Sequence, residues 1–433
     1  MITKLKKINI ITLGCSKNTV DSEQLASKLT NCGFKVTHNS ETTNFDIAMV
    51  NTCGFINAAK EESINTILEL VELKKLKKIE KIIIFGCLAQ RYKEELKTEI
   101  PEVDMLFGNF NLDELLKYLG ASKITDEKYN RNFDSYGHYA YLKIAEGCNR
   151  NCSFCAIPLI KGKYQSRNFH DIIDEAKYLA KKGVKELLLI AQDLNYYGYD
   201  IDKKFLLPEL VLQLSEIQGV EWIRLHYLYP FLFPKKLIEV IANNPKVCKY
   251  IDIPLQHVSD KVLKSMNRRG TKQQILELLN NFREKIPELA IRTTMLIGHP
   301  QETEEDFNEL IEFIKEQKFD RLGVFTYSEE EGTKSATKYK DSIPQEIKEQ
   351  RAEKIMSIQQ DISFEKNQTK VNKIFKVLID RKENNNYIGR TEYDSVEVDN
   401  EVLISSENKL KTGNFYDVLI TEAFDYDLTG KII

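Results

Sequence analysis

The chain has 433 residues, of which 42% are hydrophobic and 29% are charged, and its formal net charge is -3. This composition is typical of globular proteins, and the length predicts two or three domains. The near-neutral charge excludes a protein whose overall charge draws it to nucleic acid or to an anionic membrane.

The sequence contains no apolar run of the roughly 20 residues needed to span a bilayer, so no membrane partner is expected. The first apolar run, Ile8–Leu13, is interrupted by Asn9 and Thr12. Because a signal peptide needs a longer uninterrupted run and a cleavage site, this segment predicts a first β-strand in a cytoplasmic protein.

The first part of the chain alternates between strand-like apolar runs and segments with helical periodicity. The predicted strands are Ile8–Leu13, Asp46–Val50, Ile82–Phe85 and Met105–Phe107. The predicted helices are Ser22–Leu29, Ala58–Leu73, Leu88–Leu96 and Leu112–Leu119. This alternation predicts a parallel α/β domain over residues 1–121, and residues 121–135 predict a polar linker.

A second alternating series follows and predicts a domain over residues 135–366. Its strands are Tyr139–Ile144, Glu186–Ala191, Trp222–His226, Tyr250–Ile253, Ala290–Ile297 and Leu322–Phe325. Its helices include Ile172–Lys181, Leu207–Ile217, Pro234–Ile241, Gln273–Ile286 and Glu304–Glu316. Six βα units predict an open or partial (β/α)6 barrel whose site lies at the carboxyl ends of the strands. A charged helix over Pro344–Gln368 leads out of it.

The last segment, residues 368–433, has short apolar runs and polar turns but no helical periodicity. The predicted strands are Ile374–Ile379, Tyr387–Thr391, Val396–Val398, Val402–Ile404 and Tyr416–Ala423. This pattern predicts a small all-β barrel.

Three of the eight cysteines fall within one short loop, CNRNCSFC, directly after a predicted strand. Cys148, Cys152 and Cys155 have the spacing C-x3-C-x2-C, and thiolates are the usual ligands of iron–sulfur clusters. Without a fourth protein ligand nearby, one iron of a 4Fe–4S cluster stays open to another partner. Zinc is the alternative, although structural zinc sites close with four ligands. Three cysteines without a metal are the remaining alternative.

Three further cysteines, Cys15, Cys53 and Cys87, each directly follow an apolar strand, in the segments IITLGC, IAMVNTC and IIIFGC. The carboxyl ends of parallel strands share one edge of a sheet, where α/β folds bind ligands. The sequence therefore predicts a second metal cluster on this trio, although cysteine is also a common small core residue. Cys32 and Cys248 lack that position and are interpreted as core residues.

The cysteine loop resembles the signature of the radical S-adenosylmethionine (SAM) superfamily. The resemblance implies that the open iron chelates SAM, which a single electron cleaves to a 5′-deoxyadenosyl radical. It also implies that Phe154 lies beside the adenine, although simple packing is the alternative for this side chain. Gln192, Gln256 and Gly298 follow predicted strands and are candidate SAM contacts; His257 and His299 are weighed as proton-transfer groups against packed histidines.

All three predicted domains together resemble the methylthiotransferase family, whose last domain is a TRAM barrel. The family resemblance implies two 4Fe–4S clusters, the second of which, on Cys15, Cys53 and Cys87, supplies or carries sulfur. It also implies that a second SAM donates the methyl group, and that the partners are a sulfur donor and an electron donor such as flavodoxin or ferredoxin.

Segments such as CSKNTVDSE, NTCGFINAAKEES and FCAIP resemble the branch of the family that modifies the β-carbon of an aspartate in small ribosomal subunit protein twelve. The rival branch modifies adenosine in tRNA, and a non-catalytic iron–sulfur protein is the rival from another class. The predicted barrel, residues 370–433, holds nine Lys and Arg against twelve Asp and Glu. Because RNA binding favours clustered positive charge, this balance favours a basic ribosomal protein as the substrate over tRNA.

Overall fold

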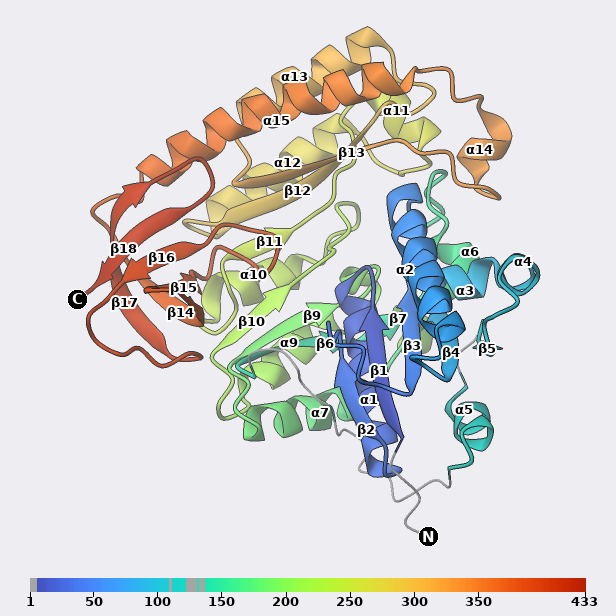
Figure 1. Cartoon of the computed structure of the whole chain (residues 1–433). Helices are drawn as coiled ribbons and strands as arrows, with labels where there is room; N and C mark the ends of the chain where they lie inside the picture. Colours follow the sequence, from blue (N-terminus) through green and yellow to red (C-terminus); the bar gives the residue numbers. More distant parts are fainter. Residues whose placement is uncertain (1–5, 109–110, 122–130, 132–136) are drawn as a thin grey trace. The chain divides into compact units, whose positions relative to one another are not determined.

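The structure is a computed structural model that describes residues 6–108, 111–121, 131 and 137–433. Most of the linker expected over 121–135 lies outside these ranges. The chain forms two compact units: residues 1–135 with 156–162, and residues 136–155 with 163–433 (Figure 1). In the described residues no helix is both long and apolar enough to cross a membrane. The sequence-based borders between three domains stay predictions.

The first unit is built on a parallel sheet. Its strands, in spatial order, are β2 (Lys35–His38), β1 (Lys7–Thr12), β3 (Ile47–Thr52), β4 (Lys81–Gly86) and β5 (Met105–Leu106). The edge strand β2 was not predicted, because its four residues alternate between exposed and half-buried and form no apolar run. The central strand β3 is buried along its whole length, as parallel strands covered on both faces are.

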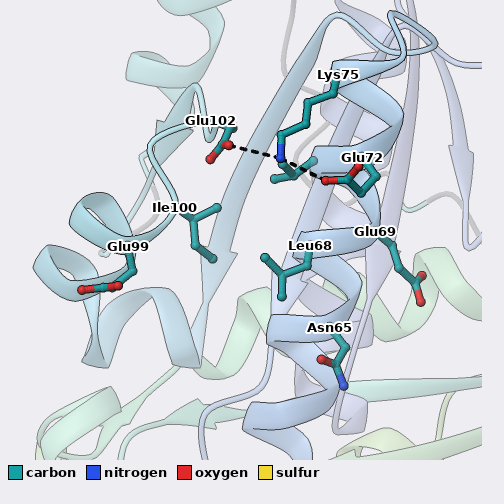
Figure 2. Close-up of a pocket in the computed structure, with 9 residues that line it drawn as sticks. Asn65, Leu68, Glu69, Glu72, Lys75, Glu99, Ile100 and Glu102 are labelled. Atoms are coloured by element: carbon teal, nitrogen blue, oxygen red, sulfur yellow. Dashed lines mark hydrogen bonds and ion pairs between the residues drawn. The ribbon is translucent and has the colours of Figure 1, made fainter.

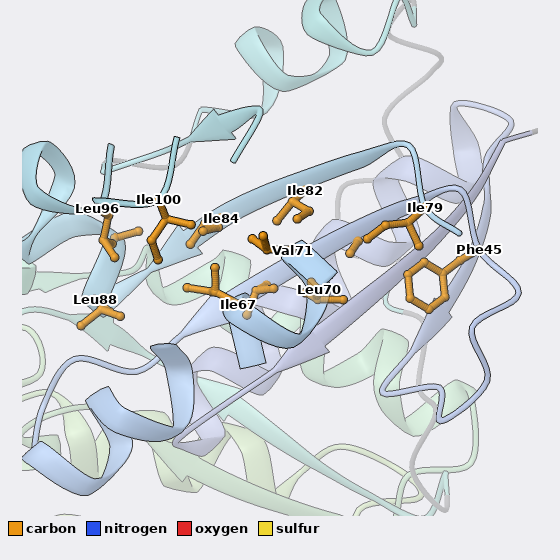
Figure 3. Close-up of a cluster of buried hydrophobic side chains, with 13 residues drawn as sticks. Phe45, Ile67, Leu70, Val71, Ile79, Ile82, Ile84, Leu88, Leu96 and Ile100 are labelled. Atoms are coloured by element: carbon orange, nitrogen blue, oxygen red, sulfur yellow. The ribbon is translucent and has the colours of Figure 1, made fainter. Parts of the chain in front are cut away.

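Helices cover both faces of this sheet. They are α1 (Ser16–Asn31), α2 (Asn57–Lys75), α3 (Cys87–Arg91), α4 (Lys93–Glu99), α5 (Leu112–Tyr118) and α6 (Ile157–Lys161). On one face α2 packs Ile67 and Val71 against Ile82 and Ile84 of β4 (Figure 3). On the other, α1 and α5 pack against β1, β3 and β4. The single helix predicted over Leu88–Leu96 is interrupted at Tyr92, where the backbone leaves helical geometry (φ -123°, ψ 41°).

The second unit begins with two parallel sheets. The strands of the first, in spatial order, are β10 (Trp222–Leu225), β9 (Glu186–Ile190) and β6 (Tyr139–Lys143). Those of the second are β11 (Tyr250–Asp252), β12 (Ala290–Ile297) and β13 (Arg321–Thr326). A parallel bridge between Ile223 and Val247 links β10 to the segment that leads into β11. The predicted open barrel is therefore confirmed.

Longer helices alternate with these strands. They are α7 (Phe169–Lys181), α9 (Leu207–Ser215), α10 (Lys235–Asn243), α12 (Lys272–Lys285), α13 (Glu304–Gln317) and α15 (Gln345–Gln368). Figure 1 shows α15 running alongside α13. Short elements decorate the loops: β7 (Ala145–Glu146), β8 (Gln165–Ser166), the 3-10 turn η1 (Leu194–Tyr196), α8 (Tyr199–Asp202), α11 (Asp260–Ser265) and α14 (Lys334–Lys338).

The chain ends in a closed barrel within the same unit. Its strands, in spatial order, are β14 (Ile374–Glu383), β15 (Asn386–Arg390), β16 (Val402–Ser405), β18 (Leu428–Ile432) and β17 (Phe415–Ala423). The strand predicted over Val396–Val398 is wrong: Glu397 has a positive φ of 68° and the Asp399 carboxylate accepts a hydrogen bond from the Ser395 N–H at 2.8 Å, which makes this segment a turn. The last strand, β18, was missed because its residues (LTGKI) are only partly apolar.

Buried ion pairs hold the barrel against the preceding sheets. The Arg390 guanidinium of β15 bonds Asp380 of β14 at 2.6 Å and Glu186 of β9 at 2.7 Å. Glu186 also accepts from Arg224 of β10 at 2.8 Å. Burial opposes ionisation of Glu186, but the two arginines outweigh it and hold its pKa below the ordinary value. Trp222 packs beside the ring of Phe415 in the barrel, with the ring centroids 4.8 Å apart.

Candidate functional site

Cys15, Cys53 and Cys87 lie at one edge of the sheet in the first unit. β1, β3 and β4 are neighbours in parallel register, with Thr12 opposite Asn51 and Thr52 opposite Gly86. Cys53 and Cys87 each follow their strand by one residue, and Cys15 comes three residues after β1. The three cysteines therefore leave the carboxyl ends of three adjacent strands.

The backbone segments that carry these cysteines approach each other closely. A Cβ placed on Gly14 would lie 2.8 Å from the Cys53 Sγ, and one on Gly54 would lie 2.9 Å from the carbonyl carbon of Cys87. A side chain at either glycine would collide with the neighbouring cysteine segment. Burial raises the pKa of the Cys53 thiol, and the neighbouring charge of Cys15 raises it further. The donor set, three thiols at one sheet edge, fits a thiolate-held cluster.

Polar side chains fix the loops of this edge. The Ser63 hydroxyl accepts from the Cys53 N–H at 3.0 Å and donates to the Cys53 carbonyl at 3.1 Å. The Asn18 amide donates to the carbonyls of Leu13 at 2.8 Å and Thr52 at 3.3 Å. Sequence reasoning did not single these side chains out, although they fall within the segments CSKNTVDSE and NTCGFINAAKEES.

In the second unit, the loop with Cys148, Cys152 and Cys155 follows β6 and β7. The Cys148 Sγ accepts from the Arg150 N–H at 3.4 Å, and the Cys152 Sγ accepts from the Arg268 guanidinium at 3.7 Å. Burial raises the pKa of Cys148 to about 11. In the parts of the chain that the structure describes, no three His, Cys, Asp or Glu side chains converge on a position for a single metal ion.

A hydrogen-bonded clamp holds this loop by Ser153, the residue after Cys152. The Ser153 hydroxyl donates to the Ser265 carbonyl at 2.8 Å and accepts from the Ser335 hydroxyl at 2.8 Å. The Ser335 N–H donates to the Ser153 carbonyl at 2.7 Å. The His299 ring nitrogens lie 3.0 Å from the Ser335 hydroxyl and 3.2 Å from the Ser265 hydroxyl. His299 is therefore packed into the support of the loop.

The candidate SAM contacts lie at strand carboxyl ends of this unit. Gln192 follows β9 and donates to Glu146 at 2.7 Å, while its buried Oε1 has no partner among the described residues. Gln256 follows β11 and has a φ of 73°. Gly298 follows β12, and its N–H donates to Glu302 at 2.8 Å. A Cβ on Gly298 would lie 2.4 Å from the Lys348 side chain, so this position also serves packing.

Phe154 and His257 have packing partners. Phe154 packs against Val262, Met266, Leu296 and Tyr327, which agrees with the packing alternative for this ring. The buried His257 accepts from the Ser259 N–H at 3.0 Å and lies 3.6 Å from Glu302. The place of Phe154 beside the adenine and the role of His257 in proton transfer stay predictions.

Buried polar atoms around the cysteine loop lack partners in the described part of the chain. They are Gln192 Oε1, Asp193 Oδ1, Arg268 Nε and the Tyr164 hydroxyl. Burying a polar atom without a hydrogen bond is unfavourable, so such atoms fit a polar ligand. Together with three thiols and no fourth ligand in the loop, this environment fits a 4Fe–4S cluster with SAM at its open iron.

A groove of about 610 Å³ lies elsewhere on the first unit (Figure 2). It is lined by α2 and the end of α4, with Leu68 and Ile100 among glutamates, and Lys75 bridges Glu72 at 3.0 Å and Glu102 at 3.6 Å. None of the six cysteines is among the described residues that line it. The groove is therefore separate from the cysteine edge.

Comparison with known proteins adds to this geometry. The chain matches the radical SAM superfamily over residues 142–314, Uncharacterized protein family UPF0004 over 7–108 and the TRAM domain over 371–433. Among solved structures it is similar to TsrM, a radical SAM methyltransferase of Kitasatospora setae, with a TM-score of 0.55 at 13% identity over 74% of this chain and 72% of that chain. At this identity the likeness shows the fold alone.

Curated relatives match nearly the whole chain. A protein of Bacteroides thetaiotaomicron named ribosomal protein uS12 methylthiotransferase RimO is 53% identical over 431 residues, 99% of both chains. Relatives of the same name from Christiangramia forsetii and Flavobacterium johnsoniae are 52% and 50% identical over 99% of this chain, and the matches cover 94% and 98% of those proteins. The chain therefore belongs to the RimO family of radical SAM methylthiotransferases, and it is a transferase.

Proposed function

We propose that this enzyme inserts a methylthio group at the β-carbon of an aspartate in ribosomal protein uS12. The observation that carries the proposal is the presence of two separate cysteine trios, one at the sheet edge of the first unit and one in the loop of the second, in a chain whose relatives are named uS12 methylthiotransferases. We infer a cytoplasmic enzyme, because ribosomal proteins are made and assembled there.

Cys148, Cys152 and Cys155 would hold the radical cluster. The cluster and SAM, when bound, would supply the radical that removes hydrogen from the substrate carbon. The chain's own residues would bind and orient: Gln192, Gln256 and Gly298 at the strand ends toward SAM, and Phe154 beside the adenine. The Ser153–Ser335 hydrogen bonds hold the loop in place.

Cys15, Cys53 and Cys87 would hold a second 4Fe–4S cluster that supplies or carries the sulfur. Replacing C–H by C–S–CH3 requires a sulfur atom and a methyl group besides the hydrogen abstraction, and a second SAM would donate the methyl group. The proposal therefore includes a sulfur donor and an electron donor of the flavodoxin or ferredoxin kind as partners.

Iron and sulfide analysis after anaerobic reconstitution tests the two-cluster assignment. Two cubes correspond to about eight irons per chain. Replacement of Cys15, Cys53 and Cys87 by alanine should leave about four irons, and so should replacement of the loop trio. Cys32→Ala, a cysteine outside both trios, serves as the control and should leave the iron content unchanged. Retention of eight irons in either triple variant would refute the assignment of that trio.

The acidic composition of the barrel is a weaker argument for a basic protein substrate once the positions of its acids are known. Asp380, Asp394 and Asp399, three of its acids, are directed inward to Arg390, Arg321 and Arg292 rather than to solvent. Asp394 and Asp399 pair with arginines outside residues 370–433, so two of the three excess negative charges of the barrel are compensated within the protein. The assignment of a protein substrate therefore rests on the similarity to the curated relatives. The charge of the barrel adds little to that assignment.

Incubation of the reconstituted enzyme with uS12 or with tRNA, under reducing conditions with SAM and sulfide, tests the substrate. We expect the mass of a methylthio group on one aspartate of uS12 and no change in tRNA. A Cys148→Ala variant, which loses a ligand of the radical cluster, controls for non-enzymatic sulfur transfer. Modification of tRNA alone would assign the chain to the adenosine branch.

A further inference from the structure

Arg268 reaches the radical-cluster loop from the turn that follows α11. The residue is 5% exposed, and its two terminal nitrogens have different partners. One donates to the Cys152 Sγ at 3.7 Å and the other to the Pro254 carbonyl at 2.6 Å. The backbone carbonyl therefore aims the guanidinium at a cysteine that the sequence assigns to the cluster.

Tyr229 supports Arg268 from the side. The Arg268 guanidinium lies 4.8 Å from the centroid of the Tyr229 ring, and the Arg150 guanidinium lies 4.0 Å from the same centroid. Arg150 contributes its backbone N–H to the Cys148 Sγ at 3.4 Å. Two arginines thus share one aromatic ring, and each gives an N–H to a different cysteine of the loop.

Only one of these two arginines forms a direct ion pair with a carboxylate of the described residues. Arg150 forms a 2.7 Å ion pair with the buried carboxylate of Asp193. Arg268 has no ion pair with any described carboxylate within 4.0 Å, and its buried Nε has no hydrogen-bond partner among the described residues. Asp193 also interacts electrostatically with Arg268, so two guanidinium charges share one buried carboxylate beside the loop.

We propose that Arg268 is a positioning residue that raises the reduction potential of the radical cluster, by its hydrogen bond to Cys152 and the positive charge of its guanidinium. The proposal rests on the assignment of Cys148, Cys152 and Cys155 to that cluster. Hydrogen bonds to the sulfurs and the charge around a cluster set its potential. Because one-electron reduction adds negative charge to the cluster, a nearby cation stabilises the reduced form more than the oxidised form.

Arg268→Met, which keeps an unbranched side chain but removes charge and donors, tests this role. Arg268→Lys keeps the charge and one donor group. Arg269→Met is the matched control, because Arg269 is the exposed neighbour in the same turn. Each variant is made in the full chain that also carries Cys15→Ala, Cys53→Ala and Cys87→Ala, so that the loop cluster alone gives the EPR signal. A parallel series is made in the otherwise intact chain.

The readouts are the iron content, the midpoint potential of the cluster from an EPR-monitored redox titration without SAM, and the change in the EPR signal of the reduced cluster when SAM is added. For Arg268→Met we expect about four irons in the triple-cysteine background and, at the wild-type midpoint, about a tenfold lower ratio of reduced to oxidised cluster, which is ~59 mV for one electron. Arg268→Lys should recover part of the shift, and Arg269→Met should show none.

Three results would overturn the proposal. If Arg268→Met keeps the parent's iron content and its midpoint potential is unchanged, Arg268 does not set the potential. An unchanged midpoint with a lost response of the EPR signal to SAM would make Arg268 a SAM-binding residue instead. Loss of iron in both Arg268 variants would show a structural role only. If the chain without any Arg268 substitution holds no iron, with or without the three cysteine replacements, the proposed cluster itself is refuted. This outcome differs from all three above.

Discussion

Gly14 has a positive φ of 88° and lies against the side chain of Cys53. A Cβ at this position would come within 2.7 Å of the Cys53 Cβ and 2.8 Å of its Sγ. Such distances force one side chain to move, and a positive φ is unfavourable for any residue with a Cβ. The geometry of the sheet-edge trio therefore depends on a glycine next to the first cysteine.

Gly14→Ala should displace the Cys53 thiol and lower the iron content of the reconstituted chain by about four irons, because a thiolate-held cube needs its ligands in place. The loop cluster should be retained. Gly183→Ala is the control, since Gly183 has a φ of 101° but no atom within 4 Å of an added Cβ. Equal iron contents in Gly14→Ala and Gly183→Ala would contradict this view of the trio.

His299 is buried within the clamp of the radical-cluster loop, and burial lowers its pKa to about 4 from the ordinary 6.5. The unfolded chain therefore binds a proton more readily than the folded chain between these values. The stability contributed by the neutral ring is fully present above pH 6.5 and is lost as the pH falls toward 4.

His299→Gln should accordingly flatten the dependence of stability on pH across this window, because glutamine does not titrate. The measurement is the urea midpoint of unfolding at several pH values, compared between the two chains. His170→Gln, which replaces an exposed histidine, serves as the control and should keep the wild-type pH dependence. If wild type and His299→Gln respond in parallel to pH, His299 is not the group that titrates.

At the scale of single elements, α2 shows how one helix separates core from surface. Ile67 and Val71 are buried against the sheet (Figure 3), whereas Leu68 is 45% exposed and lines the groove of Figure 2. The apolar positions of this helix are therefore not equivalent, although periodicity alone assigns all of them to a helix.

Ile67→Ala should destabilise the chain by about 2–5 kcal/mol, because it removes buried methyl groups and leaves a cavity. Leu68→Ala, the neighbouring change of the same kind, should stay within about 0.5 kcal/mol of the wild type. Urea denaturation followed by far-UV circular dichroism measures both. Similar losses in the two variants would show that Leu68 is covered in solution.

Most elements could be predicted from local patterns because their apolar residues follow the period of the helix or strand that forms. The exceptions fall into two groups. β2 and β18 are formed by residues without an apolar run, and the predicted strand over Val396–Val398 is a turn held by a hydrogen bond from the Ser395 N–H to Asp399. Pairing with neighbouring strands decides the conformation of β2 and β18, whereas the turn over residues 396–398 is held by a local hydrogen bond.

At the scale of the whole molecule, a buried ion-pair network fastens the barrel to the parallel sheets of the second unit. Arg390, Glu186 and Asp380 are each at most 2% exposed. Removing one partner of a buried pair leaves an uncompensated charge, which costs more than an exposed pair contributes. The docking of the barrel therefore depends on this network.

Arg390→Met should destabilise the chain by about 3–5 kcal/mol. Trp222 reports on the barrel, because it is the single tryptophan and its ring packs against Phe415. Its fluorescence should change at a lower urea concentration in the variant. Arg381→Met, which removes a partly exposed arginine paired with Glu401 on the same barrel, is the control and should cost about 1 kcal/mol or less. Coincident transitions in the two variants would argue against the network.

The sequence by itself determined the three kinds of fold and the cysteine loop at 148–155, because strand periodicity and the spacing within this loop are local properties. For Cys15, Cys53 and Cys87 it gave only positions after strands, and the order of the sheet put those strands side by side. The tertiary structure alone decided which side chains contact the cysteine loop and which barrel acids are buried. It placed Arg268 beside Cys152 although 116 positions separate them, tied Ser153 to Ser335 across 182, and turned three barrel acids inward. Such contacts join residues distant in sequence, and no local pattern records which side chains will meet when the sheets pack.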